Sequence, residues 1–277
     1  MASRDFRSKS KTKNITKYGT RKQKVKKYSD KVQQLIDVYK DTCEYFASSK
    51  VNGYLLSIHQ LVVDVSLYSP VFTEISVKDI DTLDLAYELH QENNTRKILV
   101  LNMASAMKPG GGVLSGKTAQ EECLFRRTNA FITHDPSFYT LDDDQIIFSP
   151  EITVIKDSNY DKIKPFTVGM ISVAALKNPK TRDNNYRFDK DRQIMKQKIK
   201  SIFKVALLNK YDNLVLGALG CGVYNNPLDE VFALFEKSIN KYGCYFPKIT
   251  FAILSVGRNG MENYEKFKQL DGKKIDL

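Results

Sequence analysis

The sequence predicts an α/β fold of three layers, in which a central mixed sheet is flanked by helices. Short apolar segments of strand type alternate along the chain with longer segments whose apolar residues recur every three or four positions. This alternation is typical of layered α/β folds, because the helix after each strand covers a face of the sheet. Residues 29–277 contain no internal repeat and no Pro/Gly-rich linker, so we expect one domain there.

The predicted elements follow from these periodicities. An additional N-terminal helix is expected at residues 29–48, where apolar residues recur from Val32 to Phe46. Four further helices are predicted, at residues 83–91, 118–131, 189–210 and 228–242. Strands are predicted at residues 71–77, 97–103, 166–174, 214–219 and 249–255.

The positive charge of the chain is concentrated at its N-terminus. Residues 1–27 hold eleven Lys or Arg and one acid, so they carry +10 of the net charge of +11. Because residues 1–28 are also almost free of large aliphatic side chains, we expect this segment to be a disordered basic tail outside the domain. Such a tail favours contact with a polyanion through its Lys and Arg side chains, or a nuclear address at residues 21–27. The alternative is a solubilising tail with no partner.

Composition excludes several other classes of protein. No segment approaches the roughly 18 consecutive apolar residues of a membrane span, and the N-terminus lacks the apolar stretch of a secretory signal. The four cysteines and three histidines are scattered, without the spacing of a zinc site or a disulfide framework. We therefore expect an intracellular protein, cytoplasmic or nuclear, that contacts no membrane and needs neither a metal nor a cofactor.

Two glycine-rich loops each follow a predicted strand and precede a predicted helix. In open α/β sheets, ligands bind at such positions, outside the carboxyl ends of the strands. The first loop contains Gly110, Gly111 and Gly112. Three consecutive glycines lose much entropy on ordering, so they indicate positive φ or a close approach of the backbone to another group.

The end of the first loop also matches the pattern of a nucleotide-binding P-loop, G-x-x-x-x-G-K-[ST], over residues 111–118. A P-loop nucleotide hydrolase should also have a second apolar strand that ends in a metal-binding Asp. Neither the strand at 97–103 nor the strand at 214–219 ends in this way. We therefore discard this interpretation.

Two adjacent carboxylates, Glu121 and Glu122, follow the first loop near the predicted start of a helix. Glu121 stands three residues after Thr118, so it could simply complete a capping box with that residue. Glu122 has no such structural role. A catalytic acid at a helix N-terminus would need burial or a nearby anion to raise its pKa against the helix dipole.

The second loop spans residues 217–227 and precedes the helix at 228–242. Asn226 and Pro227 suit the N-cap and first position of that helix. Gly220 and Gly222 would let backbone N–H groups converge on a diphosphate, or they could serve only a tight turn. The residues alone leave both interpretations open.

Taken together, the two loops resemble the signature of the poly(ADP-ribose) glycohydrolase family of the macrodomain superfamily. The glycine triplet at 110–112, seven residues, and then Gln120, Glu121 and Glu122 are similar to the family pattern GGG-x(6–8)-QEE. The segments 102–105 and 220–224 and Pro109 also fit that pattern. The likeness extends over about residues 29–270 and is greater to the compact, bacterial-type branch. Leu219 departs from the aromatic residue expected there, and Tyr224 stands where Phe is commoner.

The resemblance implies a macrodomain-like fold, poly(ADP-ribose) or ADP-ribosylated macromolecules as partners, and a role for each matching residue. Glu122 is the expected catalytic acid and base, and Glu121 is expected to bond the ribose. The expected substrate-binding residues are Asn102, Gly110, Gly111, Gly112, Gln120, Gly220, Cys221, Gly222, Val223 and Tyr224. Of these, the glycines at 110–112 are expected to line the diphosphate and distal ribose, and Gln120, with Glu121, to orient that region. Asn102 is expected to bond the same ribose. Residues 220–224 are expected to form a second loop at the diphosphate, with Tyr224 stacking near the distal ribose.

This chemistry agrees with general principles. Cleavage of a ribose–ribose O-glycosidic bond passes through an oxocarbenium-like state, and the leaving oxygen needs a proton. One carboxyl group, Glu122, would donate that proton and then, as a carboxylate, activate water. Two alternatives remain, namely a hydrolase of mono-ADP-ribose and a macrodomain that binds ADP-ribose without cleaving it.

Overall fold

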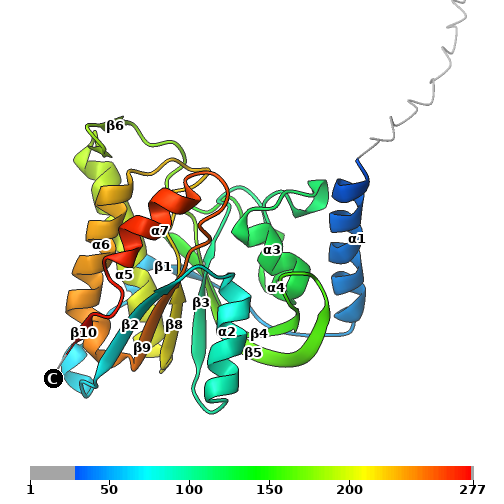
Figure 1. Ribbon diagram of the computed structural model, residues 1–277, viewed down its shortest axis with the longest axis horizontal. Helices are drawn as coiled ribbons and strands as arrows, with labels where there is room; N and C mark the ends of the chain where they lie inside the picture. Colours follow the sequence, from blue (N-terminus) through cyan, green and yellow to red (C-terminus); the bar gives the residue numbers. More distant parts are fainter. Residues whose placement is uncertain (1–28, 276–277) are drawn as a thin grey trace, which may run out of the picture.

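A computed structural model describes residues 29–275, and eight strands of this segment form one mixed sheet (Figure 1). Their order across the sheet is β1-β4-β5-β3-β8-β9-β2-β10. In chain order the strands are β1 (Tyr54–Ser57), β2 (Thr73–Lys78), β3 (Ile98–Met103), β4 (Gln145–Lys156), β5 (Lys162–Val173), β8 (Asn213–Leu216), β9 (Lys248–Ala252) and β10 (Lys274–Ile275). A separate two-stranded hairpin is formed by β6 (Thr181–Arg182) and β7 (Asn185–Tyr186).

The five central strands β5, β3, β8, β9 and β2 are mutually parallel, so their carboxyl ends meet at one edge of the sheet. The outer strands β1, β4 and β10 pair in an antiparallel manner. Because helices cover both faces, the residues of β3 from Ile98 to Asn102 are all buried. The sheet is therefore the middle layer of three.

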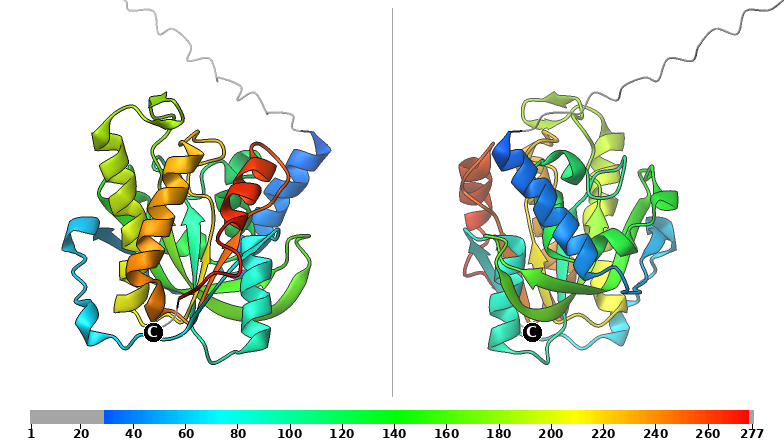
Figure 2. Two further views of the ribbon diagram at one scale, coloured as in Figure 1. Left: turned by 60° about the vertical axis from the view of Figure 1, so that its left-hand side comes forward. Right: turned by 90° about the vertical axis from the view of Figure 1, so that its right-hand side faces the viewer.

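Helices form the other two layers (Figure 2). One apolar cluster joins the sheet to α5, α6 and α7, and a second joins it to α2 and α3. The α-helices are α1 (Asp30–Tyr45), α2 (Thr82–Glu92), α3 (Gln120–Arg127), α4 (Ala130–Thr133), α5 (Asp189–Leu208), α6 (Leu228–Tyr242) and α7 (Gly260–Lys268). Short 3-10 turns lie at Ile58–Gln60, Val65–Leu67, Val113–Ser115, Pro136–Phe138 and Gly243–Tyr245.

The N-terminal helix α1 lies beside α3 and the end of the first glycine-rich loop (Figure 2, right view). The buried Arg126 side chain of α3 donates to the Leu35 carbonyl of α1 and to the Lys117 carbonyl of the loop. The Thr42 hydroxyl of α1 in turn donates to the Arg126 carbonyl. Arg126 therefore ties α1, α3 and the first loop into one unit.

The predicted three-layer fold with an extra N-terminal helix is confirmed, and most predicted elements lie within a few residues of those observed. The helix predicted over 118–131 is wrong in its extent, because it is broken into α3 and α4. At the break, the Thr128 hydroxyl donates to the Leu124 carbonyl and the Asn129 side chain accepts the Thr153 amide. The Thr128 side chain thus bonds back into α3 while Asn129 bonds to β4, and the helix is interrupted between them.

Several elements were not predicted, chiefly β1, β4 and α7. The 12-residue strand β4 contains Pro150, and its pairing with β5 is irregular between Ser149 and Ile152. A bulge accommodates the proline, which cannot donate to the ladder. No helix among residues 29–275 is both long and apolar enough to cross a membrane.

The basic tail, residues 1–28, lies outside the described residues. The division of the chain into a tail and a domain at residues 29–277 stays a prediction.

Candidate active site

The two glycine-rich loops follow neighbouring parallel strands, β3 and β8. Both therefore emerge at the carboxyl edge of the sheet, where ligands bind in open α/β folds. The Tyr224 side chain of the second loop reaches the first. Burial raises the pKa of Tyr224, a hydrogen bond with Ser105 lowers it, and the nearby charges of Glu121 and Glu122 raise it. The structure thus brings both loops and both carboxylates into one site.

Two glycines of the triplet adopt a conformation that favours glycine. Gly110 and Gly111 have φ of +62° and +51°, in the left-handed region. A Cβ at Gly110 would lie 2.6 Å from the Phe125 ring, and a Cβ at Gly111 would lie 2.6 Å from Glu122 Oε1 and 2.9 Å from Glu121 Oε2. The absence of side chains at these two positions therefore allows the backbone to lie in close contact with α3.

Glu122 lies in the first turn of α3 and is 7% exposed. The Gly112 N–H donates to its Oε1 at 2.7 Å. Its other oxygen, Oε2, is buried and has no hydrogen-bond partner. One oxygen of this carboxyl group is therefore fixed as an acceptor, and the other is left for a ligand.

Glu121 is also buried, with an exposed fraction of 4%. The Ser105 N–H donates to its Oε2 at 2.8 Å, while Oε1 has no partner. Burial raises the pKa of Glu121 to about 8; the Ser105 amide lowers it, and the neighbouring charge of Glu122 raises it further. Glu121 therefore carries a proton at neutral pH in the free protein.

The capping-box alternative for Glu121 is wrong. The helix begins at Gln120, its N-cap residue is Ala119, and no side chain caps it. The Glu121 carboxyl group instead bonds the Ser105 amide on the far side of the loop. The carboxyl group is therefore buried in a bond to the loop, whereas Thr118 is exposed.

Gln120 has its amide fully occupied by the protein. Its Oε1 accepts the Met103 N–H at 2.8 Å, and its Nε2 donates to the Leu101 carbonyl at 2.7 Å and to Thr82 at 3.1 Å. These bonds attach the start of α3 to the end of β3. The side chain therefore positions the chain around the site, and a direct contact of Gln120 with the substrate stays a prediction.

Asn102 lies near the end of β3 and is completely buried. Its Nδ2 donates to the Ser172 hydroxyl at 3.0 Å, and its Oδ1 has no partner. The side chain is also within hydrogen-bonding reach of the Glu121 carboxyl group. Asn102 therefore presents an acceptor beside the carboxyl pair.

The second loop begins with a tight turn at Gly220, which has φ of +78°. The predicted N-cap role of Asn226 is wrong, because Pro227 occupies the N-cap position and no side chain caps α6. The Asn226 amide instead donates to the Leu176 carbonyl at 2.7 Å and accepts from the Tyr186 hydroxyl at 2.9 Å. These bonds hold the second loop against the chain that follows β5.

The remainder of the second loop has an open backbone. Among residues 29–275, no protein group accepts a hydrogen bond from the N–H groups of Gly222, Val223 or Tyr224. Cys221, by contrast, is buried, and Leu219 fills the core beneath the loop where an aromatic residue was expected. Consecutive free amides are suited to an anion such as a diphosphate.

Buried polar atoms without partners gather at this site. Within the described residues there are six such side-chain atoms, and four of them belong to Asn102, Glu121, Glu122 and Tyr139. Buried polar groups in folded proteins are nearly always bonded, so a cluster of exceptions indicates a place for a ligand. Tyr139 was not predicted. Burial raises its pKa and the charge of Glu121 adds to this, which places it beside the pair, and no motif surrounds it in the sequence.

The first loop also differs from a P-loop. Its Gly112 amide, which a P-loop would turn toward a phosphate, is bonded to Glu122. Within residues 29–275, no group of three or more His, Cys, Asp or Glu side chains is arranged to hold a metal ion.

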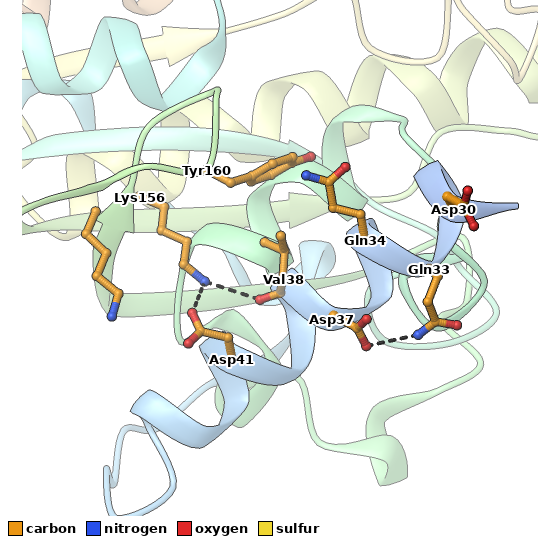
Figure 3. A pocket seen from close by; sticks show the side chains of 9 residues that line it. Asp30, Gln33, Gln34, Asp37, Val38, Asp41, Lys156 and Tyr160 are labelled. Atoms are coloured by element: carbon orange, nitrogen blue, oxygen red, sulfur yellow. Dashed lines mark hydrogen bonds and ion pairs between the residues drawn. The ribbon is translucent and has the colours of Figure 1, made fainter. Parts of the chain in front are cut away.

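A separate surface pocket of about 590 Å³ lies between α1 and the β4–β5 hairpin (Figure 3). None of the predicted site residues lines it. Lys156 pairs there with Asp41 at 2.6 Å and donates to the Val38 carbonyl, and Gln33 donates to Asp37 (Figure 3). Because these polar groups satisfy one another, we assign the ligand site to the two loops.

Comparison with known families supports this assignment. The profile of the family described as "Microbial-type PARG, catalytic domain" matches residues 9–157, which include the glycine triplet and both carboxylates. The chain belongs to this family. It is accordingly a glycosidase of the poly(ADP-ribose) glycohydrolase (PARG) type, and the predicted activity is confirmed at this level. No curated protein matches the sequence.

Solved structures of bacterial PARG enzymes are similar in fold. The enzyme from Thermomonospora curvata is 22% identical and superposes with a TM-score of 0.74, over 86% of this chain and 99% of that one. The same enzyme bound to the inhibitor ADP-HPD superposes with a TM-score of 0.73 at 22% identity, over the same shares of both chains. The enzyme from Deinococcus radiodurans in complex with ADP-ribose superposes with a TM-score of 0.66 at 23% identity, over 78% of this chain and 93% of that one. These matches confirm the fold class.

Proposed function

We propose that the chain hydrolyses the ribose–ribose bonds of poly(ADP-ribose) to release ADP-ribose, with Glu122 as general acid and then general base. The observation that carries this proposal is the cluster of buried atoms without partners around Glu122 and Glu121. It combines a carboxyl group with a free oxygen and a set of polar groups suited to a sugar.

The geometry of Glu122 suits both steps of the reaction. The Gly112 amide holds Oε1 as an acceptor, so a proton on Oε2 points to the ligand space. In the first step that proton passes to the leaving 2′-oxygen as the bond from C1″ to this oxygen breaks. In the second step Oε2 accepts a proton from water, whose oxygen joins C1″, and Glu122 regains its starting state.

Glu121 and Asn102 are proposed to hold the ribose. Protonated Glu121 offers a donor, since its Oε2 already accepts from Ser105 and its Oε1 has no partner. Asn102 Oδ1 offers an acceptor. A ribose hydroxyl both donates and accepts, so this pair is complementary to the sugar.

The two loops are proposed to hold the diphosphate. The free amides of Gly222, Val223 and Tyr224 supply donors, and the first loop lies opposite with Gly110, Gly111 and Gly112. A bound diphosphate near Glu122 would favour the protonated state of that carboxyl group, because a like charge disfavours ionisation. It would also stabilise the positive charge that develops on the ribose.

Incubation with purified poly(ADP-ribose), followed by chromatography, tests this function. We expect free ADP-ribose to accumulate and the rate to be unchanged by excess EDTA. Parallel incubation with a mono-ADP-ribosylated protein tests the alternative hydrolase. Release from that substrate alone, or binding without release from either, would contradict the proposal.

The basic tail is proposed to strengthen binding to long polymer. Residues 1–27 carry +10, and poly(ADP-ribose) carries two negative charges per unit. Deletion of residues 1–27 should leave the rate on a short substrate unchanged and weaken binding to long polymer at low salt. The difference should shrink as salt rises, because exposed charges are screened within about 8 Å at physiological ionic strength. Equal polymer affinity at low salt would leave only the nuclear address or a solubilising role.

A further inference from the structure

One buried titratable group beside the site has no part in the mechanism above. His134 follows α4 and is completely buried. Its Nε2 lies 2.7 Å from the Ser172 hydroxyl, and its Nδ1 lies 2.9 Å from the Ala130 carbonyl. Ser172 is also the residue to which Asn102 donates. His134, Ser172 and Asn102 thus form a chain of hydrogen bonds that ends at the proposed ribose site.

The contacts of His134 determine which ring nitrogen holds the proton. The Ala130 carbonyl can only accept, so Nδ1 must carry the hydrogen that bridges the 2.9 Å contact. Burial lowers the pKa of His134 to about 4, with the Ala130 bond opposing it, so the ring is neutral. Nε2 is therefore without a hydrogen and must accept.

The direction of the remaining bonds follows. Ser172 has a single hydroxyl hydrogen, and it must donate to His134 Nε2. Its oxygen is then left to accept, and the donor is Asn102 Nδ2 at 3.0 Å. The two residues are register partners on the adjacent strands β3 and β5, so the backbone holds them side by side. The amide of Asn102 can thus have only one orientation.

We propose that His134 is a positioning residue that, through Ser172, fixes the Asn102 amide with its oxygen toward the substrate. This proposal rests on the proposed role of Asn102 in holding the ribose. With the proton on Nε2 instead, Ser172 would donate to Asn102, and the amide would turn its nitrogen toward the sugar. The tautomer of a buried imidazole thus sets whether the site offers an acceptor or a donor.

The surroundings of His134 stabilise this tautomer. The Phe125 ring packs edge-on against the imidazole, with ring centroids 5.1 Å apart. The Thr133 hydroxyl lies 3.1 Å from Nδ1, donates to the same Ala130 carbonyl and accepts from Ser149. These neighbours are uncharged. Since Phe125 also lies beneath Gly110, the imidazole is part of the same packed unit as the glycine triplet.

The tautomer can be read directly in the free, unmodified protein. The chain has three histidines, so long-range ¹H–¹⁵N correlation spectra can resolve each ring. For His134 at pH 7 we expect a protonated Nδ1 and an unprotonated Nε2. An Nε2-protonated ring, or an imidazolium, would overturn the proposal whether or not the protein binds ADP-ribose.

A double-mutant cycle tests the connection to the substrate. Ser172→Ala should weaken ADP-ribose binding about fivefold, the scale of one net hydrogen bond. In the Asn102→Ala background, the same change should alter affinity less than twofold, because nothing remains to be oriented. Ser201→Ala, which removes a buried hydroxyl that donates to the Lys198 carbonyl within α5, is the matched control and should leave affinity within twofold.

Each outcome of the cycle is decisive. An equal loss from Ser172→Ala in both backgrounds would mean a general structural effect and would overturn the relay. An unchanged affinity in folded Ser172→Ala protein would overturn it as well. Failure of the unmodified protein to bind ADP-ribose would instead contradict the proposed function, while the spectrum of His134 would still test the relay.

Discussion

The two glycine-rich loops differ in what their backbone contacts. In the first, every glycine of the triplet lies against a side chain of its own chain, namely Phe125, the Glu121 and Glu122 carboxyl groups, or Lys117. In the second, Gly220 is packed, but a Cβ at Gly222 would meet nothing within 4 Å. The amides that follow Gly222 have no acceptor among the described residues.

This difference separates two uses of glycine in one site. The first loop uses it to bring backbone against the carboxyl groups and to set their positions. The second uses it to leave backbone exposed for a ligand. Substitutions in the first loop should therefore disturb catalysis, binding and folding together, whereas substitutions at the open end of the second should disturb binding alone.

Among substitutions in the two loops, the largest effect is expected for Gly111→Val. The new side chain would displace both carboxyl groups at a position with φ of +51°. The free energy of ADP-ribose binding should become less favourable by about 1–3 kcal/mol. Turnover should fall by a larger factor than the affinity does. Calorimetry and a cleavage assay measure the two. Unchanged affinity would mean that the triplet is only a turn.

A second prediction concerns the buried proton of Glu121. Its pKa is about 8 in the folded protein against 4.5 for the ordinary side chain, so the folded state holds a proton that the unfolded state loses in between. The stability from this proton is complete below about pH 4.5 and is lost as pH rises through 8. The free energy of unfolding of the ligand-free protein should thus fall by on the order of a few kcal/mol over this range.

Glu121→Gln removes the titrating group and should flatten that dependence. Denaturant titrations at pH 5, 6.5 and 8, with and without the substitution, measure the difference. Parallel curves for the two proteins would mean that Glu121 is ionised in the folded state.

The smallest effect is expected for Gly222→Ala. A Cβ there enters open space, so the melting temperature should stay within about 1 °C of the original, as for surface changes generally. ADP-ribose affinity should fall a few-fold, because the methyl group enters the space of the ligand. Gly110→Ala is the contrasting variant and should lower the melting temperature, since its Cβ would meet Phe125 at φ of +62°. Equal loss of stability in both variants would erase the distinction between the loops.

Much of the fold was predictable from sequence. Burial on both faces gives the apolar run of β3, and burial of one face gives the apolar periodicity of α5 and α6. The position of the loops followed as well, since parallel strands end at one edge. The strand β4 was not predicted because Pro150 is unfavourable within a strand. It is accommodated only by a bulge in the pairing with β5, which the sequence does not reveal. The role of Asn226 was mistaken because its tertiary partners, Leu176 and Tyr186, are 50 and 40 residues away.

The hydrogen bonds within the site could not be predicted from sequence either, because their partners are also brought together only by the fold. Glu121 and Glu122 are adjacent in sequence, but their amide partners, Ser105 and Gly112, come from different parts of the loop. His134, Ser172 and Tyr139 carry no motif and approach the site only through folding.

The most direct test of the account is the comparison of Glu122→Gln with the unmodified protein on poly(ADP-ribose) and on ADP-ribose. Gln keeps an oxygen that can accept the Gly112 N–H, so the loop should stay in place and ADP-ribose affinity should remain within about threefold. Release of ADP-ribose from the polymer should fall about 10³-fold, the scale of lost general acid–base catalysis. Cleavage at the original rate, or a loss of binding as large as the loss of turnover, would contradict the assignment of Glu122 as the group that transfers the proton.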